Sequence, residues 1–190
     1  MRLRQICDDP GMFIDNYSGG SGKLDSLLEI IKEYTGEGHR ILVFSQFVTG
    51  LDRVAEQLTK AGILFYTITG DTPSKERIRL MNEFNAGTEV PVFLISLKAG
   101  GTGLNLTGAD TVIHLDPWWN VAAEDQATDR AHRIGQVKNV EVIKLICENS
   151  VEQRVIELQN TKKDIIDSII SSSDKSVTSA TLEDISFILR

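Results

Sequence analysis

The stretch Ile41-Leu42-Val43-Phe44-Ser45-Gln46 decides the fold of this chain. Its first four residues form a continuous apolar run, without the alternation of apolar and polar side chains that marks a half-exposed strand. Such a run predicts a short strand that is covered on both faces, as in a parallel sheet. The small polar side chains of Ser45 and Gln46 predict that the strand ends there.

Further strands and helices alternate along the rest of the chain. Apolar runs that predict strands lie at 65–68, 92–95, 112–115 and 140–146. Amphipathic stretches that predict helices lie at 23–34, 48–58 and 121–132. This alternation predicts an α/β fold with a mostly parallel sheet and helices on both faces. Ligands of such folds bind at the carboxyl ends of the strands, so we expect the functional residues in the loops that follow them.

Two more helices are expected from their start signals. Thr72 can cap a helix that has Pro73 in its first position and turns Ile78, Met81 and Phe84 inward. Near the C-terminus, Ser150-Val151-Glu152-Gln153 has the pattern of a capping box and opens a long helix toward Ile170. A serine-rich linker at 171–174 and a short helix at 181–189 are expected to follow.

The composition excludes several classes of protein. The 190 residues carry a formal net charge of -7, with 41% hydrophobic and 25% charged residues. A domain that holds DNA by itself is usually basic, so a stand-alone DNA-binding module is disfavoured. No apolar run reaches the roughly 18 residues of a membrane span, and the first residues lack a secretory signal. These first residues read like the interior of a helix, which indicates a piece of a longer protein.

The cysteines and the glycine-rich stretches predict neither a metal site nor a complete nucleotide site. Cys7 and Cys147 are expected to be buried free thiols rather than a disulfide. In the stretch 19–24, Leu24 stands where a phosphate loop needs Ser or Thr for magnesium, so a linker before a helix is expected. After Gly101-Thr102-Gly103, Leu106 replaces the third glycine of a dinucleotide fingerprint.

The most informative stretch for function is 124–136, Glu-Asp-Gln-Ala-Thr-Asp-Arg-Ala-His-Arg-Ile-Gly-Gln. On a continuous helix, Gln126, Arg130 and Arg133 would share one face. Guanidinium groups match phosphate oxygens in a fork geometry, so this face suits an anion. On spacing alone, a surface helix whose arginines pair with nearby carboxylates is an equally good interpretation.

This stretch resembles motif VI of SWI2/SNF2 ATPases in helicase superfamily 2. The resemblance covers almost the whole chain, because 41–47, 68–71 and 96–106 are similar to further motifs of the family, and 3–10 is similar to the segment that leads into its second lobe. It implies a RecA-like C-terminal lobe at 23–150, a leading segment at 1–22 and a helical extension at 151–190. It also implies that Arg130 and Arg133 are arginine fingers, with Gln126 lining the same cleft.

The glycine-rich loop of 96–106 is expected to touch two ligands. By the resemblance, Ser96, Lys98 and Gly100 face DNA, whereas Gly103 and Asn105 face ATP. Glycine lets the backbone come close to a ligand with its N–H groups free to donate. A tight turn that needs glycine only for its shape is the alternative.

Polar and aromatic residues after other strands extend the expected DNA surface. Ser45, Gln46, Thr69 and Gly70 suit phosphate contacts that position a duplex without reading its sequence. Helix capping is the alternative role of Ser45. The resemblance places Trp119 against the minor groove, although packing is the commoner role of two adjacent tryptophans.

The resemblance implies that this chain is one lobe of a translocase on double-stranded DNA. ATP with Mg²⁺ would be held mainly by an N-terminal RecA-like lobe of the same polypeptide, and the isolated chain, without a Walker A loop, is expected to be inactive. The alternatives are a non-catalytic docking module and an RNA helicase lobe. A bacterial cytoplasmic location is expected, or a nuclear one in a eukaryote.

Overall fold

The computed structural model describes residues 2–87, 89–100, 104–118, 121–131 and 139–171 of the chain. The predicted linker after Ser171, the helix at 181–189 and the sites at Gly103, Trp119 and Arg133 lie outside these residues. The helices are α1 (Arg2–Asp8), η1 (Pro10–Met12), α2 (Gly22–Gly36), α3 (Val48–Lys60), α4 (Ser74–Ala86), α5 (Leu97–Gly100), α6 (Val121–Thr128) and α7 (Val151–Ser171). The strands are β1 (Ile41–Ser45), β2 (Phe65–Ile68), β3 (Val92–Ser96), β4 (Thr111–His114) and β5 (Glu141–Lys144).

The five strands form one parallel sheet in the order β2-β3-β1-β4-β5. The predicted fold class is therefore confirmed. β1 lies at the centre, and all five of its residues are buried, as its continuous apolar run predicts. β5 lies at one edge and is largely exposed, which explains why its signal in the sequence is weaker.

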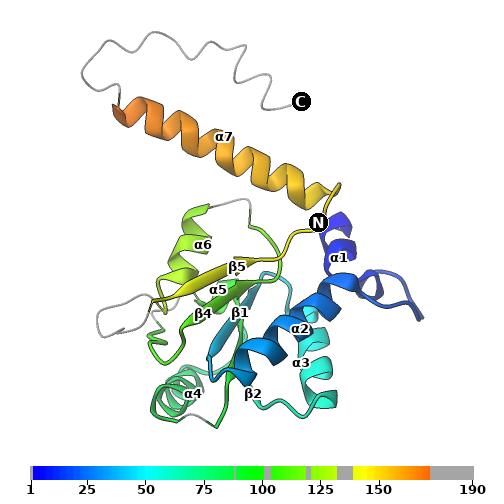
Figure 1. Ribbon diagram of the computed structural model, residues 1–190, viewed down its shortest axis with the longest axis vertical. Coiled ribbons are helices and arrows are strands. Elements are labelled where there is room, and N and C mark those ends of the chain that lie inside the picture. The colour runs from blue at the N-terminus through cyan, green and yellow to red at the C-terminus, as the bar shows by residue number, and fades with distance from the viewer. Residues whose placement is uncertain (1, 88, 101–103, 119–120, 132–138, 172–190) are drawn as a thin grey trace.

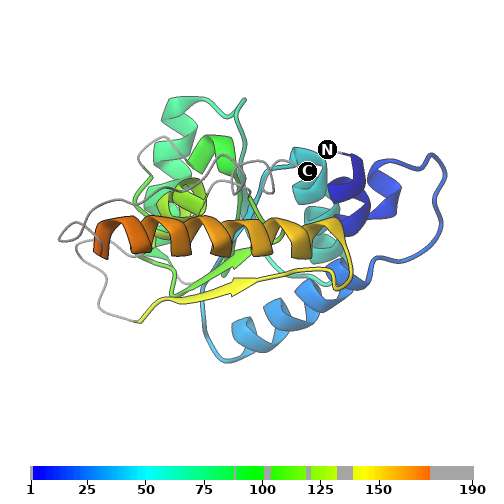
Figure 2. The same cartoon turned by 90° about the horizontal axis from the view of Figure 1, so that it is seen from above.

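The alternating side chains of β1 divide the core into two layers. Leu42 and Phe44 point into a layer formed with α4, α5 and α6. Ile41 and Val43 point to the opposite face, which α2 and α3 cover. Figure 2 shows these two groups of helices on opposite sides of the sheet.

Helix α4 differs from its prediction in its cap and in its buried face. It begins at Ser74 after Pro73, while the hydroxyl of Thr72 accepts a hydrogen bond from the amide of Thr69 at 3.0 Å instead of capping the helix. Ile78 is 55% exposed, so its predicted inward position is wrong. Leu80 and Phe84 make the buried contacts of this helix. The helix begins one residue later than predicted. Phe84 is buried and Met81 packs against the core, as predicted, while Leu80 is buried in place of Ile78.

Helix α6 is shorter than predicted. It ends at Thr128, and the amides of Arg130 and Ala131 donate to the carbonyls three residues before them, at 3.1 and 3.0 Å. Bonds of this spacing tighten the last turn of a helix. The expected continuous face through Gln126 and Arg130 is therefore not formed: Gln126 is exposed and Arg130 is buried.

Helix α7 lies across the carboxyl end of the sheet (Figure 1), where the side-chain Nε2 of Gln159 donates to the carbonyl of Trp118. Its start is capped as predicted, because the Ser150 hydroxyl accepts from the amide of Glu152 at 3.1 Å. The Gln153 side chain accepts from the amide of Asn149 instead of that of Ser150. Within the described ranges, no helix is long and apolar enough to span a membrane.

Candidate functional site

The carboxyl ends of the parallel strands bring most of the predicted site residues to one edge of the sheet. The register pairs Ser45 of β1 with Ser96 of β3, and Ile68 of β2 with Ile95 of β3. The loops after these strands therefore start side by side. Predicted residues that meet at this edge are Ser45, Gln46, Thr69, Gly70, Ser96, Lys98 and Gly100.

Ser45 and Ser96, for which contacts with DNA are predicted, are both buried in this lobe. The hydroxyl of Ser45 is 0% exposed and donates to the Asp116 carboxylate at 2.5 Å. It also accepts from the amide of Phe47 at 3.0 Å, although Phe47, and not Ser45, is the cap of α3. Ser96 is 2% exposed and its hydroxyl accepts from the amide of Ala99. Both serines hold the loops rather than present themselves to a ligand.

Gln46, Lys98 and Gly70 remain open toward the edge. Lys98 and Gly70 are exposed, and Gln46 is half-buried. The backbone amide of Gln46 donates to Asp116 at 3.2 Å, while its side-chain Nε2 has no hydrogen-bond partner among the described residues. These three residues offer an ammonium group, a side-chain amide and backbone, which are groups that suit phosphate oxygens.

The turn that contains Thr69 and Gly70 is held by Arg77 of α4. The Arg77 guanidinium donates to the carbonyls of Thr69, Gly70 and Thr72, at 3.2, 2.7 and 2.7 Å. These bonds fix three carbonyl oxygens of one turn at once, which a planar guanidinium with several donors can do. Arg77 is a functional candidate that the sequence reasoning did not assign.

Asn105 lies near the end of the glycine-rich loop of 96–106. Its backbone is fixed by Asn85, whose amide group donates to the Asn105 carbonyl at 2.7 Å, and by the sulfur of Met81. The side-chain oxygen is buried and has no hydrogen-bond partner among the described residues. An acceptor in this state is ready for a donor from a ligand or a water molecule.

Arg130 is held inside the lobe. It is 3% exposed, and its carbonyl accepts from the amide of Leu106 at 2.9 Å, which ties the turn after α6 to the end of the glycine-rich loop. The two stretches predicted to face ATP, around Asn105 and around Arg130, are therefore in direct contact. Gln126, the third member of the predicted set, is exposed.

Asp116 is the buried centre of the edge, and the sequence reasoning did not assign it. Its carboxylate accepts from Ser45 and Gln46 and lies 3.7 Å from the Arg4 guanidinium of α1. Arg4 also donates to the carbonyl of Pro117. Burial raises the pKa of Asp116 to about 6, while Ser45, Arg4 and Gln46 act to lower it. The signal that could have found Asp116 is a carboxylate directly after a buried strand.

A second buried charge cluster joins α1, α2 and α7. The Lys23 ammonium donates to Asp8 at 2.9 Å, to the two carboxylate oxygens of Glu152 at 2.6 and 2.7 Å, and to the carbonyl of Leu115 at 3.0 Å. One ammonium is thus shared by two carboxylates. Burial, followed by the nearby Asp116 carboxylate, raises the pKa of Asp8 to about 8. Lys23 therefore has a structural role, because its ammonium is bound by groups of the protein itself. Ser21 is the N-cap of α2.

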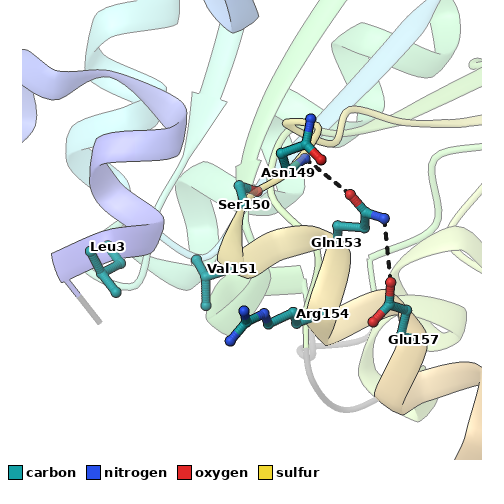
Figure 3. A pocket seen from close by; sticks show the side chains of 7 residues that line it. All are labelled: Leu3, Asn149, Ser150, Val151, Gln153, Arg154 and Glu157. Carbon is teal, nitrogen blue, oxygen red and sulfur yellow. Dashed lines mark hydrogen bonds between the residues drawn. The ribbon is translucent and has the colours of Figure 1, made fainter.

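A separate cavity of about 470 Å³ lies between the starts of α1 and α7. Figure 3 shows that Gln153 lies between Asn149 and Glu157, to which it is hydrogen-bonded at 3.0 and 3.3 Å. The Gln153 side chain is therefore occupied by the Asn149 backbone and by Glu157, and none of the predicted site residues lines this cavity. The carboxyl edge of the sheet remains the candidate site.

The sequence matches the helicase conserved C-terminal domain over residues 22–135. Among curated proteins, it is 40% identical over 169 residues to an uncharacterized ATP-dependent helicase of Mycoplasma pneumoniae, covering 87% of this chain and 16% of the relative. It is 38% identical over 179 residues to a putative ATP-dependent helicase/translocase, YwqA, of Bacillus subtilis, covering 91% and 19%. The chain thus spans less than a fifth of the length of these relatives.

Solved structures agree with this assignment. A SWI2/SNF2 ATPase core of Sulfolobus solfataricus in complex with double-stranded DNA is 34% identical, with a TM-score of 0.73, and the match covers 98% of this chain and 40% of that one. The C-terminal part of the Fun30 ATPase domain is 32% identical, with a TM-score of 0.70, covering 82% and 52%. The chain therefore belongs to the helicase conserved C-terminal domain family and is a RecA-like C-terminal lobe of the SWI2/SNF2 type.

Proposed function

We propose that this chain is the C-terminal motor lobe of a DNA-dependent ATPase that translocates along duplex DNA. The observation that carries the proposal is the convergence of Gln46, Thr69, Gly70 and Lys98 at one edge of a parallel sheet. Phosphate contacts from such groups position a duplex without reading its sequence. The match over 98% of the chain to a SWI2/SNF2 core in complex with double-stranded DNA supports duplex DNA as the partner.

The substrate ATP and its Mg²⁺ would be held mainly by a first RecA-like lobe. Lys23, in the only stretch here that looks like a phosphate loop, already gives its ammonium to Asp8, Glu152 and the Leu115 carbonyl. Gly103, Asn105 and Gln126 would complete the nucleotide site from this side. The side-chain oxygen of Asn105, buried and without a hydrogen-bond partner in the described part of the chain, fits that role, because a hydroxyl or amino hydrogen of the nucleotide would satisfy it.

We propose that Arg130 and Arg133 stabilise the negative charge that develops on the transferred phosphoryl group in the transition state. Because Arg130 is 3% exposed, its guanidinium has to leave the lobe interior when the two lobes close on ATP. The tightened turn at 128–131, which joins α6 to the rest of motif VI, is the place where such a movement would occur. Closing and reopening of the cleft, with each lobe holding the DNA backbone, would then move the motor along the duplex.

The test uses the intact polypeptide, with both lobes, and the chain described here. The chain alone should hydrolyse no ATP, and adding the first lobe should restore hydrolysis that duplex DNA stimulates. In the intact protein, Arg133→Ala should lower the rate by roughly 10³-fold or more, while DNA binding is retained. Arg130→Ala should lower the rate as strongly and should also lower the melting temperature, since the side chain is buried.

Three results would contradict the proposal. Unchanged hydrolysis in both arginine variants would indicate a docking module, whose role is binding alone. Stimulation by RNA but not by duplex DNA would indicate an RNA helicase lobe. A rate for the isolated chain near that of the intact protein would show that this lobe holds a complete nucleotide site.

A further inference from the structure

The fold brings Cys7 and Cys147 together, although 139 positions separate them in the sequence. Their sulfur atoms lie no more than 4.8 Å apart, and the Cys147 thiol donates to the carbonyl of Cys7 at 3.2 Å. Both thiols are free and half-buried. The sequence predicts two buried thiols, whereas both are only half-buried, and it does not predict that they lie side by side.

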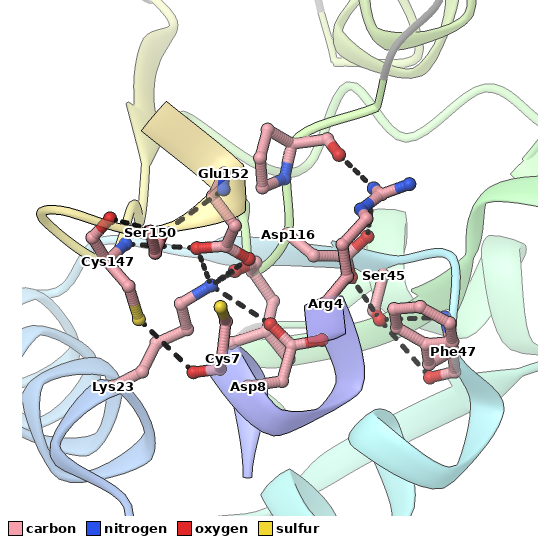
Figure 4. Close-up of polar contacts among 12 residues, drawn as sticks. Arg4, Cys7, Asp8, Lys23, Ser45, Phe47, Asp116, Cys147, Ser150 and Glu152 are labelled. Carbon is pink, nitrogen blue, oxygen red and sulfur yellow. Dashed lines mark hydrogen bonds and ion pairs between the residues drawn. The ribbon is translucent and has the colours of Figure 1, made fainter. Parts of the chain in front are cut away.

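Cys147 is held in this position by its own backbone. Its amide donates to Glu152 at 3.0 Å, and its carbonyl accepts from the Ser150 hydroxyl at 2.6 Å. Cys7 is held in turn through its neighbour Asp8, whose carboxylate and carbonyl accept from Lys23 and from Ser21 at 2.9 and 2.5 Å. The two cysteines are therefore held by different neighbours, Asp8 and Glu152, and both of these neighbours bind Lys23 (Figure 4).

A small reagent can reach both thiols. They line the same cavity, of about 590 Å³, between α1, the start of α2 and the segment 145–148 that joins β5 to α7. A soft metal ion is a poorer occupant of the site, because both oxygens of Glu152, the third nearby group, already accept from Lys23 at 2.6 and 2.7 Å. The pair is thus suited to covalent chemistry between the two sulfur atoms.

We propose that Cys7 and Cys147 are a modification site, which a small-molecule disulfide such as oxidised glutathione converts to an intramolecular disulfide. One thiolate attacks the glutathione disulfide and releases one glutathione thiolate. The second cysteine thiolate then attacks the protein–glutathione bond, forms the Cys7–Cys147 bond and releases the second glutathione thiolate. The two protons lost by the cysteines appear on the two reduced glutathiones, so that one disulfide is reduced for each one formed.

The bond would tie α1 to the segment between β5 and α7. The closed loop would contain most of the chain, and a long loop is the case in which a disulfide most restricts the unfolded state. Burial raises the pKa of both thiols, that of Cys147 to about 11, so exchange should be slow at neutral pH and faster in alkali. This inference does not depend on the proposed function.

The experiment incubates the chain with oxidised glutathione at pH 7.5 and at pH 9, with a metal chelator present, and follows the mass of the intact chain. Because the chain has only two cysteines, every oxidation product reports on this pair. We expect the mass to fall by two hydrogens, and the melting temperature to rise by about 5–10 °C, reversibly on reduction. The reaction should run faster at pH 9.

Cys7→Ser and Cys147→Ser are matched controls, because serine keeps nearly the same size. Each single variant should gain a glutathionyl group instead of losing hydrogens, and its melting temperature should not rise. If the unmodified chain instead accumulates two glutathionyl groups, or dimers linked between chains, the two sulfur atoms do not meet and the proposal is wrong. A persistently reduced chain at pH 9, alongside single variants that do react, would overturn it as well.

Discussion

The Lys23 ammonium lies 2.6 and 2.7 Å from the two carboxylate oxygens of Glu152, 129 positions further along the chain. It also reaches Asp8 and the carbonyl of Leu115, at the end of β4. This single side chain therefore connects α1, α2, β4 and α7. The connection places α1 and the start of α7 at the carboxyl edge of the sheet, next to the candidate DNA surface.

Lys23→Met should destabilise the folded chain by about 3–5 kcal/mol, because it leaves the buried Glu152 carboxylate without its cation and the buried Asp8 carboxyl group without its hydrogen-bond donor. Adding Asp8→Asn and Glu152→Gln to the same chain should recover much of the loss, since the uncompensated charges are then removed. Urea unfolding at pH 7.5 measures both changes. A loss below about 1 kcal/mol for Lys23→Met would show that the cluster is not stabilising the fold.

His114→Gln should reduce the loss of unfolding free energy that occurs as the pH falls from about 6.5 to about 4. Burial lowers the pKa of His114 to about 4. Between that pH and the ordinary value near 6.5, the unfolded chain binds a proton that the folded chain does not, so stability falls as the pH falls through this window. The loss should reach about 3 kcal/mol in total.

The measurement for His114 is the difference in unfolding free energy between the unmodified chain and the variant, at pH 4.5 and at pH 7. The difference is needed because burial raises the pKa of Asp8 and Asp116. A carboxyl group whose pKa is raised has the opposite effect on the pH dependence of stability: its contribution falls as the pH rises through the same window. Parallel curves for the two proteins would contradict the role assigned to His114.

Ser45→Ala and Lys98→Ala should separate a structural role from a direct contact at the same edge. Ser45 is buried and bonded to Asp116, so its loss should lower stability by about 1–3 kcal/mol. Lys98 is exposed, so its loss should leave stability within about 0.5 kcal/mol. In the intact protein, Lys98→Ala should weaken DNA binding and reduce the salt dependence by about one counterion. If the salt dependence of DNA binding is unchanged in this variant, Lys98 does not contact the DNA backbone.

Arg77→Lys should loosen the turn at Thr69 and Gly70, although the charge is kept. A single ammonium cannot reach three carbonyls in the geometry that the guanidinium uses, so a loss of about 1–3 kcal/mol is expected. Arg79→Lys, in the same helix but exposed and paired with Glu76 and Glu83, is the control and should change stability by less than about 0.5 kcal/mol. Amide hydrogen exchange should rise at the turn in the first variant alone.

Much of the fold follows from local patterns in the sequence. The apolar runs at β1, β3 and β4 predict buried strands, and the alternation with helices predicts a parallel sheet, because hydrophobic patterning and turn chemistry act over a few residues. The errors fall at the ends of elements and on their faces. Ile78 fits a helical period yet lies outside the core, and the helical spacing of Gln126 and Arg130 does not survive the tightening of the chain after Thr128.

The sequence by itself determined that strands and helices alternate, that polar residues follow the buried strands, and which family the chain resembles. Only the tertiary structure decided what those polar residues do. Ser45 is buried because the end of β1 lies beside the end of β4, where Asp116 accepts a hydrogen bond from its hydroxyl. Cys7 lies next to Cys147 because Lys23 binds both α1 and α7. Such contacts join residues far apart in the chain, and no local pattern of side chains specifies them.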